Sequence, residues 1–178
     1  MNDPIEIVVK KEQALEGIKQ FYIDVEEEEY KIDIFGDLYQ VISVNQSVVC
    51  CNSKQQVELV ERKLRSYNYP VSVIHDDISM EDLIKASTEF RQGSTRVLIT
   101  TDKLAGSIDV EQVSLVINFD MPVNDEMYIK TVTKSVRFGR KGVAINFITT
   151  EEMERINTIQ KTYETKIVPL PKTFMDYL

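Results

Sequence analysis

The sequence predicts an α/β domain built in three layers, with a mostly parallel sheet that carries helices on both faces. Short apolar runs typical of buried strands alternate, from one end of the chain to the other, with segments whose apolar residues recur at helical spacing. Such alternation indicates right-handed strand–helix–strand crossovers. The 178 residues contain no internal repeat and no linker rich in proline, glycine or serine. The whole chain, residues 1–178, is therefore predicted to be a single domain.

The predicted strands are recognised by their composition and length. The first is rich in β-branched and aromatic residues, and the others are short and continuously apolar, as expected of strands covered on both faces. We expect strands at residues 18–25, 47–51, 71–74, 96–101, 113–119 and 143–148. Ligands of such a sheet bind beyond the carboxyl ends of the strands, so the polar segments that follow the strands are the candidate functional segments.

The predicted helices lie between these strands and after the last of them. The segment 79–93 has the clearest limits, because it starts with the capping residue Ser79 and ends at Gly93. Further helices are expected at 27–42, 54–67, near 125–137 and at 150–163.

Composition limits the classes of function. The formal net charge of -8 argues against tight, free-standing binding of nucleic acid, because phosphate contacts dominate that affinity. No apolar run approaches the roughly 20 residues of a membrane span. The first residues also lack the apolar core of a signal peptide. A soluble, cytoplasmic protein without a membrane partner is therefore expected.

Side chains that bind metals or act as nucleophiles are scarce. His75 is the single histidine, which excludes a multi-histidine metal site, and we interpret it as a structural loop residue rather than a chemical group. Cys50 and Cys51 are adjacent on a predicted strand, so their side chains point to opposite faces. They are therefore not expected to bridge each other or to chelate a metal. We predict no metal site.

The chain lacks both common phosphate-binding loops, GxxxxGK[ST] and GxGxxG. Autonomous ATP hydrolysis is therefore not expected, and the domain can supply at most part of a nucleotide site. Yet the twelve-residue segment KTVTKSVRFGRK, residues 130–141, contains five cations and no acid. Two interpretations stay open, namely contact with a nucleotide or RNA, and a solvated helix end whose cations favour the helix dipole.

Several segments carry a resemblance to a known family. They are ALEGIKQFYIDVEEEEYKIDIFGDLY, SVVCCNSKQQVELV, FRQGSTRVLITTD, VSLVINFDMPVNDEMYI and RFGRKGVAINFI. In their order and spacing they resemble the second RecA-like domain of the DEAD-box RNA helicases, over essentially the whole chain. The resemblance implies a RecA-like fold and an ATP site between two such domains, in which the first domain carries the Walker motifs and most contacts to ATP and magnesium. The chain would then be the C-terminal half of an ATP-dependent RNA helicase, inactive alone and without a cofactor of its own.

The resemblance also implies roles for individual residues. Contacts to the RNA backbone would come from Asn52, Lys54, Thr100 and Thr101, of which Thr101 would hydrogen-bond a phosphate. Contacts to the nucleotide would come from Gly106, Asp109, Lys134 and Arg137. Lys134 and Arg137 stand at the positions of the family's arginine fingers and are the catalytic candidates.

The sequence departs from the family pattern where phosphates would bind. The family's His-Gly is His75-Asp76, which adds a side chain and a negative charge, and its Gln-x-x-Arg is Met80 and Leu83. The arginine of its Ala-Arg-Gly is Gly106.

The finger motif is also altered. Of its three arginines only Arg137 remains, because Thr131 and Lys134 take the other two places. Lysine keeps the charge but loses the planar, bidentate guanidinium.

Two functions therefore compete. The first is half of an ATP-dependent RNA helicase, which would bind single-stranded RNA weakly and close on the first RecA-like domain. The second is a non-catalytic, helicase-derived interaction module, for which a translation-initiation protein is a candidate partner. Compensating contacts elsewhere in the full protein are a third possibility.

Overall fold

The computed structural model describes residues 15, 17–101, 104, 113–133 and 142–177 of the chain. These residues form one seven-stranded sheet in the order β3-β4-β2-β5-β6-β1-β7, and every strand pairing in it is parallel. The strands are β1 (Ile18–Glu26), β2 (Ser47–Cys51), β3 (Val71–Ile74), β4 (Val97–Thr101), β5 (Leu115–Asn118), β6 (Gly142–Thr149) and β7 (Ile167–Pro169). The predicted α/β architecture with a mostly parallel sheet is confirmed.

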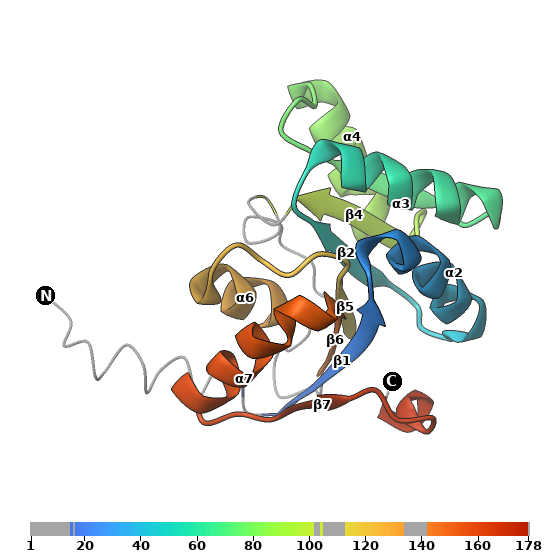
Figure 1. Cartoon of the computed structure of the whole chain (residues 1–178). Coiled ribbons are helices and arrows are strands. Elements are labelled where there is room, and N and C mark those ends of the chain that lie inside the picture. Colours follow the sequence, from blue (N-terminus) through green and yellow to red (C-terminus); the bar gives the residue numbers. More distant parts are fainter. Residues whose placement is uncertain (1–14, 16, 102–103, 105–112, 134–141, 178) are drawn as a thin grey trace, which may run out of the picture.

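Helices cover both faces of this sheet, as Figure 1 shows. Helices α2 (Lys31–Val41) and α3 (Lys54–Ser66) bury their apolar sides in one core cluster with residues of all strands except β7. On the opposite face, α4 (Met80–Arg91) packs over β2, β3, β4 and β5. Beside it, α6 (Asp125–Val132) and α7 (Met153–Thr162) pack over β1, β6 and β7. The three-layer arrangement follows from the apolar strands and one-sided helices of the sequence.

Adjacent residues of the buried strands point into different cores. Cys51 packs in the cluster under α2 and α3, whereas Cys50 packs in the cluster under α4. Both cysteines are buried, and they face opposite sides of the sheet as predicted.

Polar side chains set the starts of several helices. Ser53, Ser79 and Asn124 each accept a hydrogen bond from the backbone N–H three residues later, at the starts of α3, α4 and α6. Gly93 follows α4 with a φ of +81°, a conformation that favours glycine, so both predicted limits of this helix have their expected chemistry.

Some predicted boundaries differ from the structure. The segment expected as a helix from residue 27 begins with a 3-10 turn, η1 (Glu28–Tyr30), and the α-helix starts at Lys31. A second 3-10 turn, η3 (Thr150–Glu152), precedes α7. β7 and the 3-10 turn η4 (Phe174–Tyr177) were not predicted. Among the described residues, no helix has both the length and the apolar character needed to cross a membrane.

Candidate functional site

The predicted RNA-contacting residues lie together at the carboxyl edge of the sheet. β2 and β4 are neighbours, and Cys51, the last residue of β2, pairs with Thr101, the last residue of β4. Asn52 and Lys54 continue directly from β2, so the loop that carries them starts beside Thr101. Parallel pairing therefore brings residues about 50 positions apart in the sequence to one edge.

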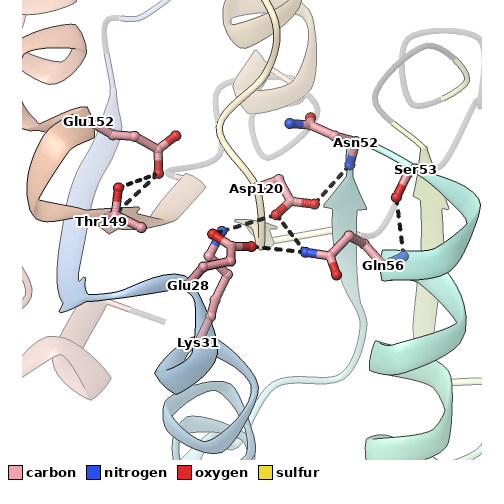
Figure 2. Close-up of polar contacts among 8 residues, drawn as sticks. All are labelled: Glu28, Lys31, Asn52, Ser53, Gln56, Asp120, Thr149 and Glu152. Carbon is pink, nitrogen blue, oxygen red and sulfur yellow. Dashed lines mark hydrogen bonds and ion pairs between the residues drawn. The ribbon is translucent and has the colours of Figure 1, made fainter.

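Asp120, just beyond β5, is the centre of a polar cluster at this edge (Figure 2). Its Oδ1 accepts hydrogen bonds from Lys31 Nζ at 3.0 Å and from Gln56 Nε2 at 3.0 Å, and its Oδ2 accepts from the backbone N–H of Asn52 at 2.9 Å. The cluster therefore connects α2, α3 and the loop after β2 through one carboxylate that is only 6% exposed.

Lys31 is a buried cation, because its residue is only 2% exposed. It forms ion pairs with Asp120 at 3.0 Å and with Glu28 at 2.9 Å, and its Nζ lies 5.5 Å from the centre of the Phe119 ring. Burial alone would lower the pKa of the Lys31 ammonium, but the two carboxylates outweigh it, so this pKa lies above its ordinary value. Lys31 is therefore charged and its charge is compensated inside the fold.

Gln56 completes the cluster on the side of α3. Its side-chain amide donates to Glu28 Oε1 at 3.1 Å as well as to Asp120, and its backbone N–H donates to the capping Ser53. The conformation of residues 52–56 is thus held by four hydrogen bonds that end on Ser53, Asp120 and Glu28.

The two threonines at the end of β4 differ in how their hydroxyls are used. Thr100 is fully buried, and its Oγ1 donates to the carbonyl of Thr101 at 3.3 Å. Thr101 is 2% exposed, and its Oγ1 has no hydrogen-bond partner within the part of the chain that the structure describes. A buried hydroxyl without a partner loses the hydrogen bonds it would make in water, at a cost of about 1–3 kcal/mol.

Lys54 does not project freely from its loop. Its Nζ lies 3.4 Å from Oδ2 of Asp77, in the loop after β3, and both side chains are largely exposed. The backbone N–H of Asp77 donates to Nδ1 of His75 at 3.2 Å, so the histidine ring shapes this loop, consistent with the interpretation of His75 as a structural residue.

Thr131, which stands where the family has the first arginine of the finger motif, has a structural role in this chain. Thr131 is fully buried in α6, and its Oγ1 donates to the carbonyl of Tyr128 at 2.9 Å. Thr133 in the same way donates to the carbonyl of Ile129 at 2.8 Å. Both hydroxyls thus donate their protons to carbonyls of their own helix and not to a ligand.

The remaining predicted site residues lie outside the described part of the chain. They are Gly106 and Asp109 of the nucleotide prediction, and Lys134 and Arg137 of both the nucleotide and the catalytic predictions. Their roles stay predictions.

Sequence reasoning marked the segments of Asp120 and of Thr149-Thr150 as candidates, because they follow strands, but it did not predict two features that they form. One is the set of contacts around Asp120. The other is a cleft of about 660 Å³ at the ends of β1 and β6, lined mainly by carboxylates (Asp24, Glu26, Glu27, Glu28, Thr149, Thr150 and Glu151). Figure 2 shows the capping contact of Glu152 with Thr149, which is one of the residues that line this cleft. Within the described residues no group of three or more histidines, cysteines or acids could hold a metal ion.

Comparisons with known proteins agree with this geometry. Residues 30–139 match the family described as the helicase conserved C-terminal domain. The chain is 52% identical over 172 residues to "ATP-dependent RNA helicase eIF4A" of Meyerozyma guilliermondii, which covers 96% of the chain and 43% of the relative. The chain thus spans less than half the length of this relative.

Solved structures show the same fold. The chain superposes on the C-terminal domain of the DEAD-box protein Dbp5 with a TM-score of 0.81 at 32% identity, covering 92% of this chain and 95% of that chain. A structure of Saccharomyces cerevisiae Dbp5 bound to RNA and ADP BeF3 also superposes with a TM-score of 0.81 at 32% identity, covering 90% of this chain and 43% of that chain.

Proposed function

The chain belongs to the helicase conserved C-terminal domain family, as the C-terminal domain of a DEAD-box helicase similar to eIF4A, and from this premise we propose that it acts as the RNA-binding second half of a cytoplasmic ATP-dependent RNA helicase. In this role it contacts the backbone of single-stranded RNA and completes an ATP site whose Walker motifs and magnesium contacts lie in a first RecA-like domain.

The single observation that carries the RNA proposal is the unpaired hydroxyl of Thr101. It lies at the carboxyl edge of the sheet, beside the loop that carries Asn52 and Lys54. Because Thr101 is only 2% exposed, RNA binding would have to uncover this hydroxyl, which could then donate to a phosphate oxygen. A hydrogen bond to a charged acceptor contributes about 1.5–3 kcal/mol. Lys54, on the loop that starts beside Thr101, would favour phosphate over a neutral ligand if its ammonium left Asp77 for the RNA.

The ATP part of the proposal rests on Gly106, Asp109, Lys134 and Arg137, together with the absence of a Walker loop from the sequence. These residues would close over a nucleotide held by the first domain. The isolated chain is therefore expected to hydrolyse no ATP, with or without RNA.

Replacing Thr101 by valine separates RNA binding from folding. Valine has the shape of threonine, and the hydroxyl that it removes has no partner, so we expect T101V to be as stable as the parent chain or slightly more stable. Its affinity for a single-stranded RNA oligonucleotide should fall about tenfold, measured by fluorescence anisotropy at low salt. The control is T158V, which removes an exposed hydroxyl from α7.

Two results would contradict the proposal. One is an unchanged RNA affinity of T101V, and the other is ATP hydrolysis by the isolated chain. The parent chain itself is expected to bind RNA weakly, because its net charge is negative, and to lose affinity as salt rises, because the RNA contacts are made by cations that neutralise phosphates.

A second candidate function, the non-catalytic interaction module, is favoured by how the structure uses two altered positions and the predicted RNA contact Lys54. Leu83 packs against the core cluster under α4, and Thr131 is buried and bonded within α6. Lys54 is paired with Asp77. Each of these arrangements reduces the number of cations that can meet a phosphate.

The Lys54–Asp77 pair provides a direct test of this weakening. We expect D77N to raise the affinity for single-stranded RNA by up to about fivefold, because an exposed ion pair contributes about 0–1 kcal/mol. The matched control is D37N on α2, which changes the net charge equally away from the site. Equal effects of D77N and D37N would show that only the overall charge matters and that Asp77 does not restrain Lys54.

A further inference from the structure

Helix α4 carries an apolar seam on its outer side that no described part of the chain covers. Met80 is 70% exposed and Ile84 is 60% exposed, and these residues lie one turn apart on the same side of the helix. Leu83 and Ile78 adjoin them and are half-buried against the core cluster below. We call Ile78, Met80, Leu83 and Ile84 the α4 seam.

The helix that carries the α4 seam is anchored in the core and capped at its start. Ala86 and Phe90 anchor the inner side of α4 in the core, and Phe90 is fully buried. The helix starts at the capping Ser79, whose side chain accepts from the backbone N–H of Asp82 at 3.1 Å. The exposed side chains of Met80 and Ile84 are therefore presented by a rigid element and not by a frayed end.

The position of the α4 seam places it at the carboxyl edge of the sheet. α4 follows β3 after a short loop, so its first turn lies at the end of the sheet where β3 finishes. An ion pair joins Asp77 in this loop to Lys54, the first residue of α3, so the starts of α3 and α4 lie at the same edge. The first turn of the α4 seam therefore follows directly on the loop that meets Lys54.

The charges around the α4 seam decide what can bind there. Glu81 and Asp82 are exposed in the first turn of α4, and Lys85 is the only cation between residues 78 and 90, whereas Asp77 before the helix is already paired with Lys54. This rim repels RNA phosphates. It also disfavours a second copy of the chain, because a symmetric pairing would bring the same acids together. A partner with an apolar face and neighbouring cations would complement both the apolar α4 seam and the acidic residues around it.

We propose that the α4 seam is a docking site for a basic amphipathic helix of a partner protein. The apolar positions 80, 83 and 84 form the kind of ridge that packs into the groove of a second helix, and lysines or arginines beside the partner's apolar stripe would meet Glu81 and Asp82. The inference goes beyond RNA and ATP binding and depends on neither.

The test uses the full chain and two synthetic helical peptides of about 20 residues with the same leucine stripe. One peptide carries lysine at its polar positions and the other carries glutamate. Fluorescence anisotropy at about 0.15 M salt should show binding of the lysine peptide only, since surface charges are partly screened there. Replacing Met80 and Ile84 together by glutamine should weaken this binding about tenfold, because both apolar contacts are lost. The control V41Q changes a valine on α2 that is 58% exposed and should leave the affinity unchanged.

Three results would overturn the proposal. In the first, the lysine peptide does not bind, or binds no better than the glutamate peptide. In the second, M80Q/I84Q binds it as tightly as the parent chain, which would indicate general attraction to an acidic protein. In the third, sedimentation shows that the parent chain self-associates and that M80Q/I84Q does not, which would make a second copy the occupant. Thermal unfolding of M80Q/I84Q confirms that the variant is folded, as expected from two exposed positions.

Discussion

Replacing Asp120 by alanine is expected to lower the free energy of unfolding by about 3–5 kcal/mol, because it breaks a buried ion pair from one side. Lys31 would keep only Glu28, whose side chain is 59% exposed, while its own side chain stays buried. The backbone N–H of Asn52 would lose its acceptor as well. Urea unfolding at neutral pH measures the change as a lower midpoint at constant slope.

A double-mutant cycle separates the pair from its surroundings. K31M removes the buried ammonium and leaves an apolar side chain beside the Phe119 ring. The double variant K31M/D120A should therefore be closer to the parent chain in stability than D120A is, because no unpaired charge stays buried. If D120A lowered the free energy of unfolding by less than about 1 kcal/mol, or if the losses in the cycle were additive, the Lys31 ammonium would have to become solvated when its partner is removed.

The strands with the strongest local signals were the most predictable part of the fold. Residues 47–51 and 71–74 form β2 and β3 with the predicted limits, because continuous apolar runs leave no other buried arrangement for segments of that length. β7 has no such signal, since only Ile167 of its three residues is buried. It pairs with β1 through tertiary contacts that local patterns do not encode.

The candidate site was predictable only where a local motif exists. The resemblance to the helicase family singled out Asn52 and Thr101, and the register of β2 with β4 brings their segments together. Asp120 lies in one of the polar segments that follow the predicted strands and was therefore a candidate, but its contact with Lys31 was not predicted, because Lys31 is 89 positions away and nothing in the spacing connects the two. Long-range polar pairs depend on the packing of whole elements and so escape pattern analysis.

The same limit applies to a chain of buried hydrogen bonds behind the site. Asn118 Nδ2 donates to Asn146 Oδ1 at 2.8 Å, and Asn146 Nδ2 donates to the hydroxyl of Tyr128 at 3.3 Å. Tyr128 donates to Gln20 Oε1 at 2.6 Å, and Gln20 Nε2 donates to Thr165 Oγ1 at 2.7 Å. Every donor points the same way, from β5 through β6 and α6 to β1, so the bonds polarise one another in a dry interior. Burial raises the pKa of the Tyr128 phenol well above its ordinary value, against the smaller effect of the bond from Asn146, and keeps the donor proton in place.

Asn146 is the central residue of this chain, and N146L is expected to lower the free energy of unfolding by about 2–4 kcal/mol. Leucine fills a similar volume, so the loss comes from hydrogen bonds rather than from a cavity. Asn118 Nδ2 would lose its acceptor, and the carbonyl of Phe21 would lose the hydrogen bond that it accepts from Asn146 Nδ2 at 3.0 Å. Asn118 is fully buried, and an unpaired donor away from water is expensive.

Urea unfolding of N146L tests this loss, and N157L is its matched control, because Asn157 is exposed on α7. N157L should change the stability by less than about 0.5 kcal/mol. The double variant N118L/N146L should recover part of the loss, since it removes the donor and the acceptor of one bond together. If N146L were as stable as the parent chain, the aligned hydrogen bonds between β5, β6 and α6 would contribute nothing to the fold that carries the candidate site.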